Sequence, residues 1–319
     1  MSIPRETWIE LQKAETLLVH AGRSRFPALA RRLSDDFPVE GHDRVYLSRL
    51  FSGFDPTHIT ADVYCVRYPF STVSAVKEVL DRLCGTDFLE PTGDGYAMTS
   101  TGMELARRWL ENADAMLSGL VGNAFRAPDA EALVRFDLRI VKALGKRSDV
   151  FPTPIFEFRA HGVQPVYGPP QLWHHWQLVW SMVACDEDAQ EHVRKARGMD
   201  PLVWFFLRQL WFVTERPWRA RLAGSRLHAI ANRYAPVEET TCRDTWERLV
   251  RLELVKGSYE SPALTERGLA THDEDEQEVD RLFLSRWPTL ADVELSELTE
   301  LTTRLNQHLE RLLQENETA

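Results

Sequence analysis

The residues of this sequence that could take part in catalysis or bind a metal ion stand in no recognisable motif. His174 and His175 are adjacent on a predicted helix, so their side chains point about 100° apart and cannot chelate one metal ion as histidines four residues apart do. The sequence contains no H-E-x-x-H, G-x-S-x-G, glycine-rich phosphate loop or dinucleotide fingerprint. We therefore expect neither an enzyme nor a bound metal or cofactor.

The cysteines also suggest no chemistry. Cys65, Cys84, Cys185 and Cys242 form no C-x-x-C pair, which disfavours a disulfide framework and a zinc site. Cys65 and Cys84 lack the basic neighbours that lower a thiol pKa, so we expect them in the core. The amino terminus shows no signal-peptide pattern, and no segment approaches the roughly 20 apolar residues of a membrane-spanning helix. These features predict a soluble cytoplasmic protein.

The net charge of −10 is unevenly distributed. Residues 253–319 hold 16 acids and 6 bases, a balance of −10, so the first 252 residues are neutral, and we expect the acids after Gly268 to face solvent. Residues 194–233 hold nine bases against two acids, a balance of +7, which favours a polyanionic partner, with a solvated arginine-rich surface as the alternative. This basic block consists of Arg194, Lys195, Arg197, Arg208, Arg216, Arg219, Arg221, Arg226 and Arg233.

The chain repeats itself at an offset of 166 residues. Seven positions in 67–102 are identical to their counterparts in 233–268, where composition alone would give roughly two. Because the offset is close to half of 319 residues, we interpret the two halves as copies of one unit. The identical pairs are Arg67/Arg233, Tyr68/Tyr234, Arg82/Arg248, Leu83/Leu249, Ala97/Ala263, Thr99/Thr265 and Gly102/Gly268.

Both halves show the same predicted order: a leading helix, three helices, a two-stranded hairpin and two long helices. The third helix after the leader has an apolar inner face at helical spacing, Val73, Val76, Leu80 and Leu83 in the first half and Cys242, Trp246 and Leu249 in the second. The last helix carries a leucine seam, Leu298, Leu301, Leu305, Leu309 and Leu312. We divide the chain into a first half (1–147), a proline-rich linker that packs against the halves (148–172) and a second half (173–319).

Two segments resemble the recognition-helix and wing region of MarR-type transcriptional regulators: STVSAVKEVLDRLCGTDFLEPTGDGYAMTSTG and TTCRDTWERLVRLELVKGSYESPALTERG. In that family a Ser/Thr-rich helix start, an apolar-D/E-R-L turn, a strand pair and L-T-x-x-G recur in this order. The resemblance implies a mainly α fold with small β-hairpin wings, in which two winged helix-turn-helix domains with long flanking helices form a pseudo-dimer. It also implies a regulator that binds double-stranded DNA as a single-chain pseudo-dimer, or as a homodimer through its terminal helices.

Carried over residue by residue, the resemblance implies that the outward face of the recognition helix contacts DNA. In the first half this face contains Ser71, Thr72, Ser74, Lys77 and Arg82, and in the second half Thr240, Thr241 and Arg243. Glu238 and Glu239 would lie unfavourably near phosphates, and Arg219, Arg221 and Arg226 on the preceding helix could compensate.

The wings depart from the family pattern. The family's wing carries an arginine that enters the minor groove, whereas EPTGDGYAM contains no base and KGSYESPAL contains only Lys256. The DNA interaction would therefore depend on the helices. The alternative is a winged-helix module that has lost DNA binding and contacts another protein.

Five tryptophans lie close together in the sequence at helical spacings: Trp173, Trp176, Trp180, Trp204 and Trp211. They indicate either a helix–helix core or a pocket for a flat aromatic effector, with Arg159, His161 or His175 as polar anchors. By resemblance, such an effector would lower DNA affinity by changing the separation of the recognition helices.

Overall fold

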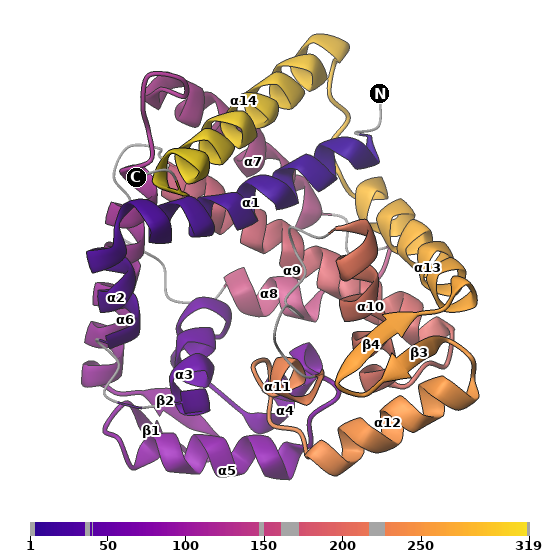
Figure 1. The fold of residues 1–319 in the computed structure, drawn as a ribbon. Coiled ribbons are helices and arrows are strands. Elements are labelled where there is room, and N and C mark those ends of the chain that lie inside the picture. Colours follow the sequence, from indigo (N-terminus) through magenta and orange to yellow (C-terminus); the bar gives the residue numbers. More distant parts are fainter. Residues whose placement is uncertain are drawn as a thin grey trace. The chain divides into compact units, whose positions relative to one another are not determined.

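The structure is a computed structural model that describes residues 4–35, 39, 41–146, 150–160, 172–216 and 227–317. These residues form mostly helices, together with two small antiparallel sheets of two strands each (Figure 1). The mainly α class with small hairpins is therefore confirmed. Within these ranges, every helix is too short or too polar to cross a membrane.

The described elements follow a similar order in the two halves, and the first half has one additional helix, α2, after its leading helix. The first half contains α1 (Arg5–Arg25), α2 (Pro27–Asp35), α3 (Gly41–Gly53), α4 (Ala61–Arg67), α5 (Val73–Cys84), β1 (Leu89–Pro91), β2 (Tyr96–Met98), α6 (Ser100–Ser118) and α7 (Ala127–Leu144). After α8 (Pro154–Ala160), the second half contains α9 (Leu172–Ala196), α10 (Pro201–Glu215), α11 (Leu227–Ala231), α12 (Glu239–Arg251), β3 (Val255–Ser258), β4 (Ser261–Leu264), α13 (Glu266–Ser285) and α14 (Asp292–Glu317). The pairs α4/α11, α5/α12, β1/β3 and α6/α13 each begin 166 residues apart, which is the offset of the sequence repeat.

The repeated threonine of the L-T-x-x-G pattern closes the hairpin against the helix that follows. Thr99 Oγ1 accepts a hydrogen bond from the Gly102 amide at 3.0 Å and donates one to the Asp87 carbonyl at 2.5 Å. Thr265 repeats both bonds at 3.0 and 2.6 Å, the second to the Glu253 carbonyl. Asp87 and Glu253 both adopt the left-handed backbone region, with φ of 63° and 57°. The two halves therefore share the same turn before the hairpin.

The repeated glycine of this pattern is required by close backbone packing. A Cβ atom at Gly102 would lie 2.3 Å from the carbonyl oxygen of Phe88, and one at Gly268 would lie 1.9 Å from that of Leu254. Neither distance is possible for a real side chain, so only glycine allows the long helix to start against the hairpin. This explains why the sequence repeats a glycine at this position.

The chain folds into two compact units, and each takes segments from both halves. Unit 1 consists of Met1–Pro38, Glu104–Asp188 and Asp280–Ala319. Unit 2 consists of Val39–Met103 and Ala189–Val279. Unit 1 therefore holds most of the long leading and terminal helices, whereas unit 2 holds the three-helix-and-hairpin segment of each half.

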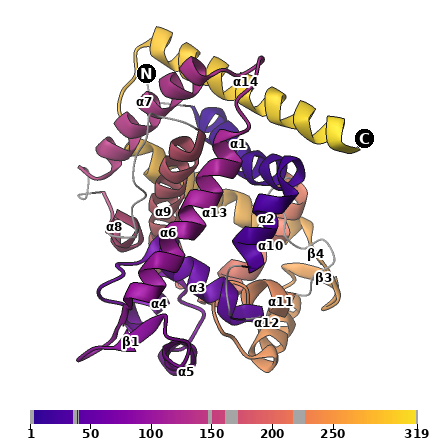
Figure 2. The ribbon, with the colours of Figure 1, turned by 90° about the vertical axis from the view of Figure 1, so that its left-hand side faces the viewer.

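In unit 1, α14 packs along α1, as Figures 1 and 2 both show. Trp8 on α1 is fully buried, with ring centroids 4.8 Å from Phe283 and 5.8 Å from Trp287. Polar contacts fix the alignment of the two helices, since the Asn306 side chain donates to the Glu10 carbonyl at 3.1 Å. Four leucines of the predicted seam are buried within the chain itself: Leu298, Leu301, Leu305 and Leu309.

The described part of the proline-rich segment also packs into unit 1. Phe151, Ile155 and Phe156 are buried. The Asp188 carboxylate accepts hydrogen bonds from the Ile155 and Phe156 amides at 3.0 and 2.9 Å, so it satisfies the first free amides of α8. The guanidinium of the buried Arg286 lies 4.3 Å from the ring centroid of Phe151.

In unit 2, α5 and α12 each bury one face. The predicted inner positions Val76, Leu80 and Leu83 of α5 are buried, as are the three predicted for α12, Cys242, Trp246 and Leu249. Val73 was expected on this face but is 43% exposed. It is the first residue of α5, and the elements packed against the helix cover only the later turns.

Candidate nucleic-acid interface

The outward face of α5 is polar and exposed. Thr72, Ser74 and Lys77 are exposed, and Thr72 Oγ1 also accepts a hydrogen bond from the Ala75 amide at 3.2 Å, which caps the helix. Arg82 lies 2.9 Å from the Asp43 carboxylate of α3 and is partly exposed, so its charge is balanced by an acid within the protein.

Ser71 has a different environment from the other residues expected on this face. It is half-buried, and its hydroxyl donates a hydrogen bond to the Pro236 carbonyl at 2.5 Å. Because Pro236 precedes α12, this bond joins the segment before α5 to the segment before α12. No local pattern indicates this contact, since the two residues are 165 positions apart.

The outward face of α12 is more acidic at its start. Thr240 and Thr241 are exposed, as expected. Arg243 lies 2.8 Å from the Glu239 carboxylate and 4.0 Å from that of Glu260, and its guanidinium lies over the Tyr259 ring at 4.7 Å. Arg243 is thus surrounded by acids from its own helix and from the β3–β4 turn.

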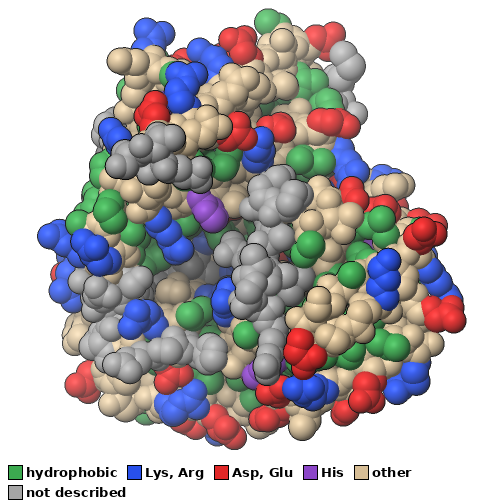
Figure 3. Space-filling view, in the orientation of Figure 1, with side chains coloured by type: hydrophobic (Ala, Val, Ile, Leu, Met, Phe, Trp, Pro, Cys, Tyr) green, Lys and Arg blue, Asp and Glu red, His purple; other side chains and the backbone are tan. Residues whose placement is uncertain are grey.

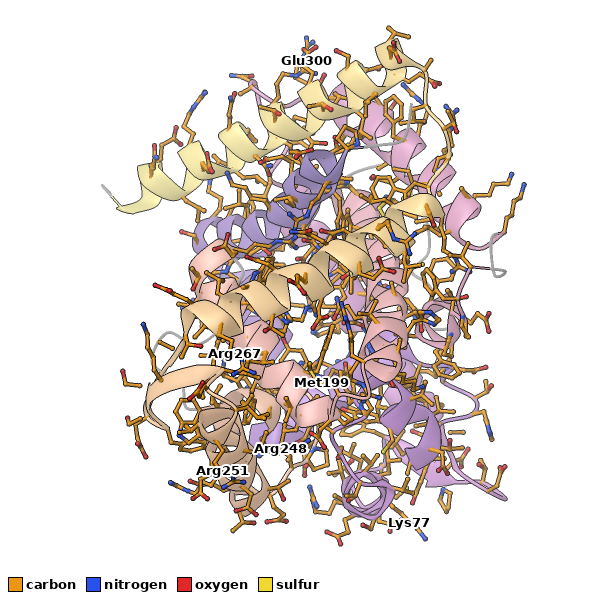
Figure 4. The ribbon with its side chains drawn as sticks, turned by 90° about the vertical axis from the view of Figure 1, so that its right-hand side faces the viewer. Lys77, Met199, Arg248, Arg251, Arg267 and Glu300 are labelled. Carbon is orange, nitrogen blue, oxygen red and sulfur yellow. The ribbon has the colours of Figure 1, made fainter. Side chains whose placement is uncertain are left out.

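Bases and acids balance on both helices. The exposed charged side chains of α5 are Lys77, Glu78, Asp81 and Arg82. Those of α12 are Arg243, Asp244, Glu247, Arg248 and Arg251, with Glu239 half-buried. Positive and negative side chains accordingly alternate along the lower edge of the molecule in Figure 3, and Figure 4 shows Lys77, Arg248 and Arg251 there. Neither helix presents a strongly positive face.

The hairpins contribute little to a DNA interface. The β1–β2 turn contains the well-exposed Asp94 and no base. In the β3–β4 turn, Tyr259 is buried with its ring centroid 6.4 Å from that of Trp246, and burial raises its pKa to about 12. Lys256 is the exposed base of this hairpin.

Two arginines of the basic block are neutralised inside unit 2 by acids of α13. Arg197 lies 2.9 Å from Asp275 and Arg208 lies 3.2 Å from Glu276, and both carboxylates are buried. The expectation that the acids after Gly268 face solvent is therefore wrong for these two residues, because each one pairs with an arginine of the block. It is also wrong for Asp280, which is buried and pairs with Arg5 in unit 1. Arg219, Arg221 and Arg226 lie outside the described residues.

The five tryptophans form two groups, one in each unit. In unit 1, Trp173 stacks on Trp176 with centroids 5.1 Å apart, and Trp176 meets Trp180 edge-on at 5.9 Å. In unit 2, Trp204 and Trp211 both meet the ring of the buried His272 edge-on, at 5.5 and 5.6 Å. All five are buried or half-buried in these groups.

The polar anchors proposed for an effector are engaged within unit 1. His175 Nδ1 lies 2.7 Å from the Asp137 carboxylate, and both side chains are fully buried. Burial raises the pKa of Asp137, while the neighbouring His175 opposes this rise. Arg159 bonds to the Gln177 side chain, and His161 lies outside the described residues. One feature of the sequence hints that Asp137 is buried against a partner such as His175. Asp137 interrupts the apolar stripe of α7 between Leu133 and Ile140.

The cysteines and histidines offer no reactive site in the described ranges. Burial raises the pKa of Cys65 to about 11 and also raises that of Cys84, so both thiols stay protonated at neutral pH. His174 is half-buried, and burial lowers its pKa. Among the described residues, no group of three or more His, Cys, Asp and Glu side chains could hold a metal ion.

Comparisons with protein-family models, with curated proteins and with solved structures each found no match to this chain.

Proposed function

We propose that this protein is a DNA-binding transcriptional regulator and that α5 and α12 are the recognition helices of two winged helix-turn-helix units. One observation carries the proposal: three helices followed by a hairpin occur in both halves, and the third helix has a buried inner face and an exposed outer face. The second helix, the third helix and the first strand of the two halves begin at one offset, 166 residues. The outer faces expose Thr72, Ser74 and Lys77 in one repeat and Thr240 and Thr241 in the other. Hydroxyl and ammonium groups of this kind suit phosphates and base edges in the major groove.

The ion pairs of the outward faces are compatible with this function. Arg82 is about half exposed beside Asp43, and Arg243 is about half exposed beside Glu239. An exposed ion pair stabilises a protein by about 1 kcal/mol or less, so either arginine can exchange its carboxylate for a DNA phosphate at little cost. Because the faces are neutral overall, we expect weak non-specific binding and a dependence on specific contacts.

A charge-reversal variant tests the proposal directly. Selection from randomised duplexes first supplies a binding sequence, and fluorescence anisotropy then measures its affinity over a range of salt concentrations. We expect Lys77→Glu, Arg82→Glu and Arg243→Glu together to lower the affinity at least about 100-fold and to flatten its salt dependence. The matched control is Lys142→Glu, Lys146→Glu and Arg311→Glu, which reverses three exposed bases of unit 1. Equal losses in the two variants would refute the assigned faces.

The second candidate is a winged-helix module that binds a protein. The observation in its favour is that bases and acids balance on both outward helices, which suits a polar protein surface better than a polyanion. This function predicts no salt-dependent affinity for any duplex DNA. It also predicts that a purified partner loses binding to the triple variant of α5 and α12 but not to the control variant.

An aromatic effector is a separate proposal, supported by the stacked pair Trp173 and Trp176. Titration with a panel of aromatic acids should quench tryptophan fluorescence in a saturable manner and lower DNA affinity in the same concentration range. Trp176→Phe should reduce the quenching, whereas Trp204→Phe in unit 2 should not. A linear response to every compound would argue against an effector.

A further inference from the structure

The starts of α5 and α12 are fastened to each other within unit 2. Ser71, two residues before α5, bonds to the Pro236 carbonyl, three residues before α12, at 2.5 Å. In Figure 1 the two helices run away from each other from neighbouring starts. Phe70, beside Ser71, packs against Phe205 of α10 with centroids 4.8 Å apart, so apolar contact supports the same junction.

Arg49 of α3 holds equivalent residues of the two repeats together. Its guanidinium lies 4.4 Å from the ring centroid of Tyr234 and 5.4 Å from that of Tyr68, and the two rings are 6.1 Å apart. The guanidinium also donates to the Tyr68 hydroxyl at 2.9 Å and to the Arg233 carbonyl at 3.0 Å. One side chain of the first repeat thus binds to the backbone and to a ring of the second.

Two further tyrosines of the first repeat donate to backbone carbonyls of the second. Tyr46 donates to the Asn232 carbonyl and Tyr64 to the Tyr234 carbonyl, both at 2.8 Å. Burial raises the pKa of Tyr46 to about 12 and that of Tyr64 well above its usual range, so both hydroxyls remain donors at physiological pH. The junction therefore combines four hydrogen bonds to backbone carbonyls of the second repeat with three ring contacts between the repeats.

This junction limits the distance between the two recognition helices. An extended residue spans at most about 3.5 Å. Two residues lead from Ser71 to the start of α5, and three lead from Pro236 to the start of α12. With the length of the bonded pair added, the two helix starts are at most about 25 Å apart. Successive major grooves on one side of B-DNA lie about 34 Å apart. The first turns of α5 and α12 therefore cannot enter two successive grooves while the junction is intact.

We infer that the DNA target is one contiguous segment read by the first turns of α5 and α12 together, rather than two half-sites one helical turn apart. The inference rests on the proposed function. At about 3.4 Å per base pair, the contacts of the two helix starts lie within about seven base pairs of each other. The target is correspondingly asymmetric, because the start of α5 offers Thr72, Ser74 and Lys77 whereas the start of α12 offers Thr240 and Thr241 beside two glutamates.

An insertion series in the selected duplex tests the inference. Five or ten base pairs are inserted at the centre of the selected sequence, and the affinity of the full chain is measured for each duplex. We expect both insertions to lower the affinity to that of random DNA. Recovery of affinity with ten base pairs, which restores the helical phase, would overturn the contiguous target but leave DNA binding intact. Failure to select any sequence would instead refute the proposed function.

A variant of the junction provides an independent test. Arg49→Met keeps an apolar side chain beside the two rings but removes the hydrogen bonds of Arg49. Arg44→Met on the same helix is the control, because the hydrogen bond of Arg44 to the Val39 carbonyl lies within the first repeat. We expect Arg49→Met to lower the affinity for the selected sequence about tenfold and Arg44→Met to leave it unchanged. If Arg49→Met does not fold, Tyr46→Phe removes one bond of the junction and should lower the affinity in the same direction. Parental affinity in folded Arg49→Met would overturn the inference.

Discussion

At the scale of single residues, the buried Glu276 of unit 2 is paired with two basic side chains. Glu276 on α13 is buried, with Arg208 3.2 Å away and His272 3.4 Å away. Burial alone would raise the pKa of Glu276, but Arg208 and His272 hold it far below its usual range. The carboxylate therefore remains charged in the folded protein at neutral pH. Removing this charge would leave Arg208 without its acid.

We expect Glu276→Gln to lower the free energy of unfolding by about 3 kcal/mol at pH 7, as breaking a buried ion pair does. The folded-state pKa is lower than the unfolded value of about 4.3, so the stabilisation is complete above about pH 5 and is lost as the pH falls below it. The difference between parent and variant in urea unfolding should therefore shrink from pH 7 to pH 3. Glu274→Gln, an exposed change on the same helix, should alter stability little at either pH.

At the scale of elements, equivalent helices of the two repeats differ in their caps. Thr72 caps α5 through its side chain. The equivalent residue before α12, 166 positions later, is Glu238, whose side chain makes no cap hydrogen bond. The first amides of α12 therefore depend on solvent or the backbone for partners, which makes this helix start less stable than that of α5.

Exchanging the two caps tests this difference. Glu238→Thr should raise the free energy of unfolding by about 0.5–1 kcal/mol, because a threonine at this position can accept an amide of the first turn. Thr72→Ala should lower it by about 1 kcal/mol, whereas Thr72→Ser should leave it nearly unchanged. Thermal or urea unfolding provides the measurement. A destabilised Glu238→Thr variant would show that the glutamate has a role other than that of an unfavourable cap.

The sequence predicts correctly those features that depend on the spacing of residues within one helix. The inner faces of α5 and α12 and the leucines of α14 follow helical spacing, and the structure buries them. The residues of the outward face of α5 could be predicted from helical spacing. The sequence could not show that Ser71 is half-buried rather than part of this face, because its hydrogen bond to Pro236 joins residues 165 positions apart. The same limit applies to Asp137 with His175 and to Arg49 with Tyr234, since spacing along one helix says nothing of the partner on another.

At the scale of the whole molecule, the terminal leucine seam is satisfied within one chain. Leu298, Leu301, Leu305 and Leu309 are buried where α14 packs against α1. A homodimer through the terminal helices would need this surface for a second copy. The packing of α14 on α1 of the same chain therefore favours the single-chain pseudo-dimer over a homodimer through the terminal helices.

We accordingly expect a solution mass near 36.8 kDa at micromolar concentration. Sedimentation equilibrium at several concentrations provides the measurement. Leu305→Asp, at a fully buried seam position, should lower the free energy of unfolding by several kcal/mol without a change in mass. Gln307→Asp, at an exposed position two residues away, should change neither. A mass twice as large would contradict the single-chain form.

The division of each unit between the two halves has a consequence for experiments that cut the chain. Unit 1 needs α1, α7 and α14, and unit 2 needs α5 and α12, so neither unit can be expressed from one half alone. A fragment that ends at 147 would lack α14 against α1 and the two partners of Arg49 in the second repeat, Arg233 and Tyr234. Co-expressed fragments 1–147 and 148–319, the second of which keeps the buried Phe151, Ile155 and Phe156, should instead behave as the two subunits of a complementing pair, each insoluble or unfolded alone and ordered together. Dividing the gene at one point would then yield a heterodimer. Its formation would require that both units fold, because each unit takes segments from both fragments.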